Sequence, residues 1–99
     1  MPTFVLMTKL APSAMHDSDG REKLGRAWLE KVKERVPGVR FSAHYAIFGP
    51  YDFMDIYDAP DAEASQRVAL ISRSEGAVSV ETWQAVAYDQ FLKMLAKVD

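Results

Sequence analysis

The side chain best suited to chemistry in this sequence is His44, in the middle of a predicted strand where it shares a predicted face with Arg40 and Ser42. A histidine changes its charge near neutral pH, so it can serve as an acid, a base or a ligand. The plainer alternative is a strand histidine that is solvated or hydrogen-bonded and takes no part in binding. Both interpretations stay open from the sequence.

Two carboxylates, Asp55 and Glu81, lie inside predicted strands among large apolar residues. A buried carboxylate needs a partner or a raised pKa. A carboxylate perturbed in this way is a candidate general base. The alternatives are an ion pair with Lys9 or Arg40, or exposure at an edge of the sheet.

Tyr51 and Asp52 begin a strand directly after the tight connection Gly49-Pro50. A phenol and a carboxylate at this point could orient a ligand at the end of the sheet. Short acidic side chains also accept hydrogen bonds from backbone N–H groups in turns, which would give Asp52 a structural role. In that case Tyr51 would pack beside Gly49.

His16, Asp17 and Asp19 bring metal-ligating side-chain types together in a predicted loop. The signal is weak because no second histidine follows nearby, and we expect no metal. The chain has no cysteine, which excludes thiolate catalysis, thiolate metal sites and disulfides. Its five glycines are scattered, so it has neither a phosphate loop nor a dinucleotide-binding fingerprint. We therefore expect no cofactor.

Length and composition indicate one small globular domain, residues 1–99, with 48% hydrophobic and 26% charged residues. The net charge of -2 gives no electrostatic reason to bind nucleic acid or an anionic membrane. The sequence begins without a basic leader, and no apolar run approaches the roughly 18 residues of a membrane span. Since small secreted domains usually need disulfides, we expect a cytoplasmic protein.

The predicted elements follow the order strand, helix, strand, strand, helix, strand, with a further helix at the C-terminus. Stretches that alternate or are rich in β-branched residues predict strands over 3–10, 39–48, 51–57 and 77–86. Apolar residues at three- and four-residue steps predict helices from a cap at Asp19 to Val36, over 62–75 and over 89–97. This order is that of the α+β ferredoxin-like fold with a four-stranded antiparallel sheet.

The hydrophobic pattern of the strands predicts a homodimer or a larger homo-oligomer. Helices can cover only one face of the sheet, yet the first strand is apolar on both faces and Trp83 faces away from Val78 and Val80. An uncovered face of this kind would exceed the largest apolar patch of a typical soluble monomer. Two sheets packed face to face across a two-fold axis would cover it. The alternative is that the C-terminal helix folds back over the free face.

Several short motifs together give the chain a family resemblance. The segment Gly49-Pro50-Tyr51-Asp52-Phe53 resembles the Gly-x-Tyr-Asp signature of the GYD domain family. The opening Met1-Pro2-Thr3-Phe4, the bridge Asp58-Ala59-Pro60-Asp61 and the segment Val80-Glu81-Thr82 resemble the family's pattern at matching positions. The resemblance spans nearly the whole chain. It implies a ferredoxin-like fold in the dimeric α+β barrel superfamily, and it implies little about activity.

Three positions depart from the family pattern. Pro50 stands where relatives often have a basic residue, Asp55 where an aliphatic residue is usual, and Val80 where a threonine is usual. If the family's site depends on a basic residue in the turn, this member differs in its ligand.

These observations favour a small-molecule-binding domain that works as a homo-oligomer. Binding pockets are mostly apolar with a few placed polar groups. A cofactor-independent enzyme that uses the barrel cleft, in the manner of small monooxygenases or isomerases, is the first alternative, by analogy of fold alone. A structural or stress-related oligomer is the second. The predicted ligand-binding residues are His44, Tyr51, Asp52, Glu81 and Trp83.

Overall fold

The computed structural model describes residues 1–99, and its elements follow the predicted order. The four strands are β1 (Thr3–Leu10), β2 (Arg40–Ala46), β3 (Phe53–Asp58) and β4 (Ala77–Ala85). The helices are α1 (Ser18–Arg35), α2 (Ala62–Ser74) and α3 (Tyr88–Ala96), with a short 3-10 turn at Pro12–Ala14.

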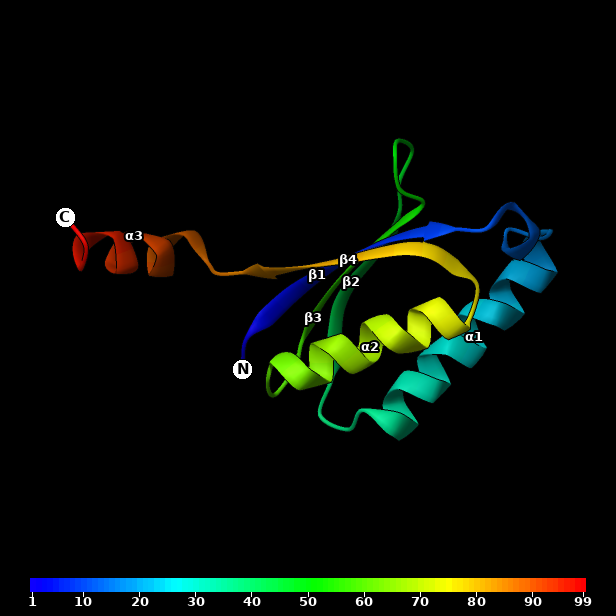
Figure 1. Cartoon of the computed structure of the whole chain (residues 1–99), viewed down its shortest axis with the longest axis horizontal. Helices are drawn as coiled ribbons and strands as arrows, with labels where there is room; N and C mark the ends of the chain where they lie inside the picture. Colours follow the sequence, from blue (N-terminus) through cyan, green and yellow to red (C-terminus); the bar gives the residue numbers. More distant parts are fainter.

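The strands form one antiparallel sheet in the order β2-β3-β1-β4. Helices α1 and α2 lie side by side against one face of this sheet (Figure 1). The opposite face, which we call the open face, carries no helix of the chain. This arrangement confirms the predicted α+β ferredoxin-like fold.

The core lies between the sheet and its two helices because the strands alternate inward and outward side chains. On β1, Phe4 and Leu6 point toward the helices and are buried. Val32 from α1 and Val68 from α2 meet them and are fully enclosed. Burying these side chains supplies most of the driving force for folding, at roughly 1.5–3 kcal/mol each.

The predicted alternation along β2 is wrong at one point. It placed Phe41 and His44 on opposite faces, but the register of β2 against β3 shifts between Phe41 and Ala43. One extra residue on β2 brings both side chains to the face covered by the helices, since Phe41 pairs with Tyr57 and His44 with Asp55. This bulge places His44 next to Asp55 on the neighbouring strand.

The predicted helix cap at Asp19 is also wrong by two positions. Asp17 has the extended backbone that an N-cap requires, and its carboxylate accepts the Gly20 N–H at 2.8 Å. Asp19 lies inside the first turn, where an acidic side chain favours the helix dipole. Asp17 and Asp19, two of the three residues weighed as metal ligands in this segment, therefore both serve the helix.

Helix α3 projects beyond the end of the sheet rather than folding back over the open face (Figure 1). None of its residues is buried, and its apolar side chains are all exposed. No helix of the chain is both long and apolar enough to cross a membrane.

Candidate functional site

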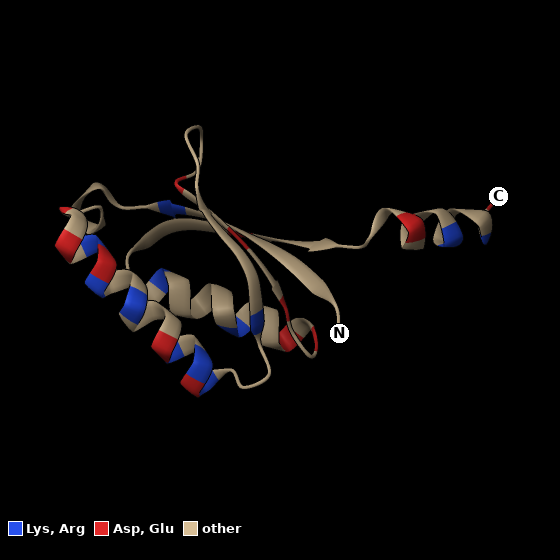
Figure 2. Ribbon diagram, turned by 180° about the vertical axis from the view of Figure 1, so that it is seen from behind, with Lys and Arg blue, Asp and Glu red and all other residues tan.

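A cleft of about 740 Å³ lies between α1 and the helix-covered face of the sheet. We call it the helix-side cleft. Charged residues gather along α1, whereas the ribbon of the sheet is mostly uncharged (Figure 2). The inner walls of the cleft are correspondingly apolar, and five large side chains form them: Leu10, Trp28, Leu29, Phe41 and Phe53.

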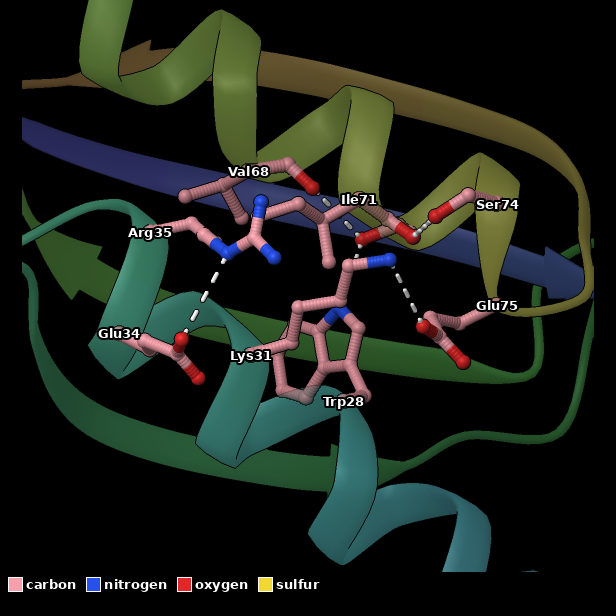
Figure 3. Close-up of polar contacts among 9 residues, drawn as sticks. Trp28, Lys31, Glu34, Arg35, Val68, Ile71, Ser74 and Glu75 are labelled. Atoms are coloured by element: carbon pink, nitrogen blue, oxygen red, sulfur yellow. Dashed lines mark hydrogen bonds and ion pairs between the residues drawn. The ribbon is translucent and has the colours of Figure 1, made fainter.

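Trp28 is fixed in the wall of the cleft by a hydrogen bond between the two helices. Its indole Nε1–H donates to Ser72 Oγ at 2.9 Å, and that hydroxyl in turn donates to the Val68 carbonyl at 3.0 Å (Figure 3). An ion pair between Lys31 and Glu75, at 3.2 Å, joins α1 to the end of α2 nearby. These contacts hold α1 at a defined position over the sheet.

The floor of the cleft holds one polar pair, His44 and Asp55. His44 Nδ1 and Asp55 Oδ1 are in direct contact, with Asp55 only 3% exposed and the histidine side chain 61% exposed. Burial raises the pKa of Asp55, and the nearby His44 opposes that shift only in part. The sequence-based alternative of a partner at Lys9 or Arg40 is not what the structure shows for Asp55.

The contact with Asp55 fixes how His44 presents itself to the cleft. The imidazole ring stacks on Phe53, with ring centroids 5.7 Å apart and planes 19° from parallel. Because Nδ1 faces the carboxylate, Nε2 is the nitrogen left for a ligand, and it makes no hydrogen bond within the chain. A carboxylate in contact with one ring nitrogen of a histidine orients the ring and sets which nitrogen faces the cleft.

The signature residue Asp52 acts on the backbone rather than on the cleft. Its carboxylate accepts the Leu10 N–H at 2.8 Å, and its own N–H donates to the Thr8 carbonyl at 2.8 Å. Its carbonyl accepts the Ile47 N–H at 2.9 Å. Asp52 therefore ties the β2–β3 connection to the end of β1.

The remaining predicted site residues lie on the open face. In the register of β1 and β4, Glu81 pairs with Met7 and Trp83 pairs with Val5. Val5 and Met7 alternate along β1 with Phe4 and Leu6, which face the helices, so Glu81 and Trp83 lie on the opposite face. The Tyr51 hydroxyl and the Trp83 indole Nε1–H both donate to the Glu81 carboxylate, the latter at 2.9 Å.

These hydrogen bonds determine the titration of the open-face pair. The bonds donated by Tyr51 and Trp83 lower the pKa of Glu81. The bond to Glu81 is the main cause that raises the pKa of Tyr51. We call Tyr51, Glu81 and Trp83 the open-face cluster. The five predicted site residues are thus not one constellation, since His44 lines the cleft and the cluster lies on the other side of the sheet.

The cleft contains residues that the sequence reasoning did not single out. Arg21, Gly25 and Trp28 are not among the predicted site residues, yet all three line the cleft. Their spacing of four and three residues puts them on one face of α1, and this is the signal that could have found them. The structure contains no group of three or more His, Cys, Asp or Glu residues placed to hold a metal ion.

Fold and site together define a small ferredoxin-like α+β protein with a cleft between its first helix and its sheet. The chain belongs to the GYD domain family, which it matches over residues 4–95. This finding confirms the resemblance seen in the signature Gly49-Pro50-Tyr51-Asp52 and the segments around it.

Individual proteins resemble the chain in sequence or in structure. The chain is 37% identical over 92 residues to a Thermus thermophilus protein named "Glutamine synthetase and cystathionine beta-lyase binding protein", covering 87% of this chain and 90% of that protein. It is similar in structure to TTHA0845 from Thermus thermophilus, with a TM-score of 0.60, 25% identity, and 88% and 95% of the two chains covered. The 30S ribosomal protein S6 of Thermotoga maritima shares the fold, with a TM-score of 0.53, 19% identity, and 99% and 98% coverage.

Proposed function

We propose that this protein binds a small molecule in the helix-side cleft, with His44 as the main polar contact. The observation that carries this proposal is the buried Asp55, which holds Nδ1 of His44 and leaves Nε2 directed to a ligand. The cleft volume of about 740 Å³ suits a small organic ligand. Five of its 15 lining residues are large apolar side chains, and charged and polar residues, with Gly25, line the rest.

Native mass spectrometry of freshly purified protein tests this proposal, because it detects retained small molecules. We expect extra mass on the parent protein and its loss in His44→Ala. Glu81→Gln is the matched control, since it alters a carboxylate on the opposite face of the sheet and should retain the extra mass. Extra mass that survives in His44→Ala and disappears in Glu81→Gln would contradict the proposal.

The same pair supports a second candidate, a cofactor-independent enzyme. A histidine oriented by a buried carboxylate is a common form of general base. His44 would accept a proton from the bound substrate at Nε2 while Asp55 stabilises the resulting imidazolium. The compound recovered from the protein, incubated with the parent and with His44→Ala, separates the two functions. Turnover by the parent alone indicates an enzyme, and unchanged compound in both samples indicates a binding protein.

We also propose that a second copy of the chain covers the open face, as the hydrophobic pattern of the strands predicts. Tyr45 and Trp83 are 56% and 48% exposed there. Helix α3 adds an uncovered apolar side, in which Phe91 and Leu92 are each 45% exposed. A helix of nine residues is marginal in water unless its apolar side packs on something. Reciprocal contact between two copies would cover both surfaces at once.

Light scattering coupled to size-exclusion chromatography tests the oligomer. We expect a dimer or a multiple of dimers for the parent. Leu92→Glu should be a monomer, because a charge on the apolar side of α3 would disrupt its contact with the second copy. The variant should still fold, since Leu92 contributes nothing to the core of its own chain. Lys97→Glu, a charge change just beyond the same helix, is the control and should leave the assembly intact. A parent protein that elutes as a monomer would contradict the proposal.

The Thermus thermophilus relative supports a further candidate, binding to another protein. That relative is named for binding glutamine synthetase and cystathionine beta-lyase, and it is 37% identical to this chain. We propose that any such partner of this chain binds the outer surface of its oligomer. Titration with glutamine synthetase from the same organism, followed by sedimentation velocity, tests this candidate. Co-sedimentation supports it, and independent sedimentation of the two proteins contradicts it.

We propose that the protein acts in the cytoplasm, whichever of these functions it has.

A further inference from the structure

We infer that the ligand of the helix-side cleft is an organic anion with a flat apolar body, and that Arg21 binds its acidic group. This inference rests on the proposed function and names the class of ligand for the same site. It comes from the charges in the cleft, from the packing around Phe53 and from one glycine in α1.

Arg21 is the cation of the cleft that has no acidic partner. The other charged side chains that line it are paired, Glu22 with Arg26 at 2.6 Å and Glu75 with Lys31 at 3.2 Å. Asp55 is paired with His44. Arg21 makes one hydrogen bond, from Nη1 to the Ala14 carbonyl at 2.8 Å, which positions the guanidinium without neutralising it.

Arg21 and His44 surround the same aromatic ring. The guanidinium carbon of Arg21 lies 5.5 Å from the centre of the Phe53 ring, and the His44 ring centroid lies 5.7 Å from it. Both side chains also line the cleft. An acidic group beside Phe53 could therefore accept hydrogen bonds from the planar guanidinium, a geometry suited to carboxylates. His44, when protonated, would donate from Nε2 to the same acidic group.

Gly25 leaves space for the body of that ligand. A glycine inside a helix destabilises it by roughly 0.5–1 kcal/mol relative to alanine, yet this one lies in the middle of α1. A Cβ at this position would meet only Arg21 Nη2, at 3.9 Å, so no packing within the chain requires glycine here. It does line the cleft, opposite a sheet that contributes Phe41 and Phe53. A flat apolar group fits between them.

Binding of a matched pair of probes tests the inference. Cinnamate has a flat apolar body and a carboxylate, and cinnamyl alcohol is its neutral counterpart. We expect isothermal titration calorimetry to show cinnamate binding about tenfold more tightly than the alcohol, from hydrogen bonds to a charged group. Arg21→Gln should abolish this preference. Arg73→Gln removes the same charge from an exposed position on α2 and should preserve it.

A second variant tests where the body of the ligand lies. Gly25→Leu fills the cleft from α1 with a better helix former, so it should weaken both probes about tenfold without lowering the melting temperature. Unchanged binding by Gly25→Leu would overturn the placement of the ligand.

The outcomes separate the two proposals. Equal binding of cinnamate and cinnamyl alcohol in the parent, unaffected by Arg21→Gln, would overturn the anion while leaving a cleft that binds small molecules. Binding of neither probe would overturn the anion inference and count against the cleft as well. A preference for cinnamate that disappears in Arg21→Gln and persists in Arg73→Gln would support both.

Discussion

The helix-side cleft and the open-face cluster place a carboxylate in opposite situations on the two sides of one sheet. Asp55 is buried and its pKa is raised, whereas Glu81 is exposed and its pKa is lowered. The side-chain partners lower the pKa of both carboxylates, so they do not explain why the two shifts have opposite signs. Burial does, because taking a carboxylate out of water disfavours its charged form.

The comparison also separates polar groups whose hydrogen bonds are satisfied within the chain from polar groups that keep unused hydrogen-bonding atoms. In the open-face cluster, both oxygens of Glu81 are satisfied by Tyr51 and Trp83. In the cleft, Nε2 of His44 and part of the Arg21 guanidinium make no hydrogen bond within the chain. Asp52, from the family signature, belongs with the structural groups since all its hydrogen bonds go to the backbone. This contrast is why we propose the cleft, rather than the family signature, as the binding site.

The largest effect on stability is expected at Asp52. Asp52→Ala removes the acceptor of the Leu10 N–H and should lower the free energy of unfolding by about 1–3 kcal/mol, the cost of leaving such a group unpaired. Asp52→Asn keeps a side-chain oxygen and should lose clearly less. Urea unfolding followed by circular dichroism measures both. Equal losses in the two variants would contradict a role as an acceptor.

Removing the side-chain hydroxyl of Tyr57 should raise stability, whereas the substitution of Asp52 should lower it. The hydroxyl of Tyr57 is buried without a hydrogen-bond partner, and burial, followed by the charge of Asp55, raises its pKa to about 12. Tyr57→Phe removes the unsatisfied hydroxyl and keeps the ring that stacks on Phe4, so we expect stability to rise by about 1 kcal/mol. A loss of stability in the same urea experiment would show that the hydroxyl has a partner.

The pH dependence of stability should distinguish the two carboxylates. The pKa of Asp55 is higher in the folded protein than its ordinary value of about 3.8. The free energy of unfolding therefore falls as the pH rises from about 3.8 through the folded pKa, because the unfolded chain loses this proton first. A lowered folded pKa means that Glu81 adds stability above about pH 4.5, which is lost as the pH falls through its folded pKa.

The two substitutions should therefore move the profile in opposite directions. Between about pH 3 and pH 6, stability should rise more steeply with pH in Asp55→Asn than in the parent and less steeply in Glu81→Gln. Urea unfolding at each pH measures these slopes. Slopes that change in the same direction in both variants would contradict the contrast between the faces.

The smallest effect is expected from Tyr51→Phe. The bond to Glu81 is at the surface, so the melting temperature should fall by no more than about 2 °C. The pKa of Glu81 should rise toward its ordinary value, because the hydrogen bond from Tyr51, which lowers that pKa most, is removed. Carbon-detected NMR titration of the Glu81 carboxyl measures this shift. An unchanged pKa would mean that the two side chains do not interact in solution.

The fold could be predicted from the sequence because its periodicities report burial directly. The alternation in β4 and the three- and four-residue steps in α2 gave element bounds within one residue of those observed. The face that His44 uses could not be predicted, since it depends on one extra residue in β2 that no glycine or proline marks. Arg21 was missed because its role depends on where α1 lies over the sheet.

The two tryptophans test the central claim most directly, since one lies on each side of the sheet. Trp28 lines the cleft and bonds to Ser72, and Trp83 bonds to Glu81 in the open-face cluster. A proton–nitrogen correlation spectrum resolves their indole N–H signals separately. If ligands bind in the cleft, titration with cinnamate should shift the Trp28 signal and leave the Trp83 signal in place. A shift of the Trp83 signal alone would place binding on the open face and contradict the proposed site.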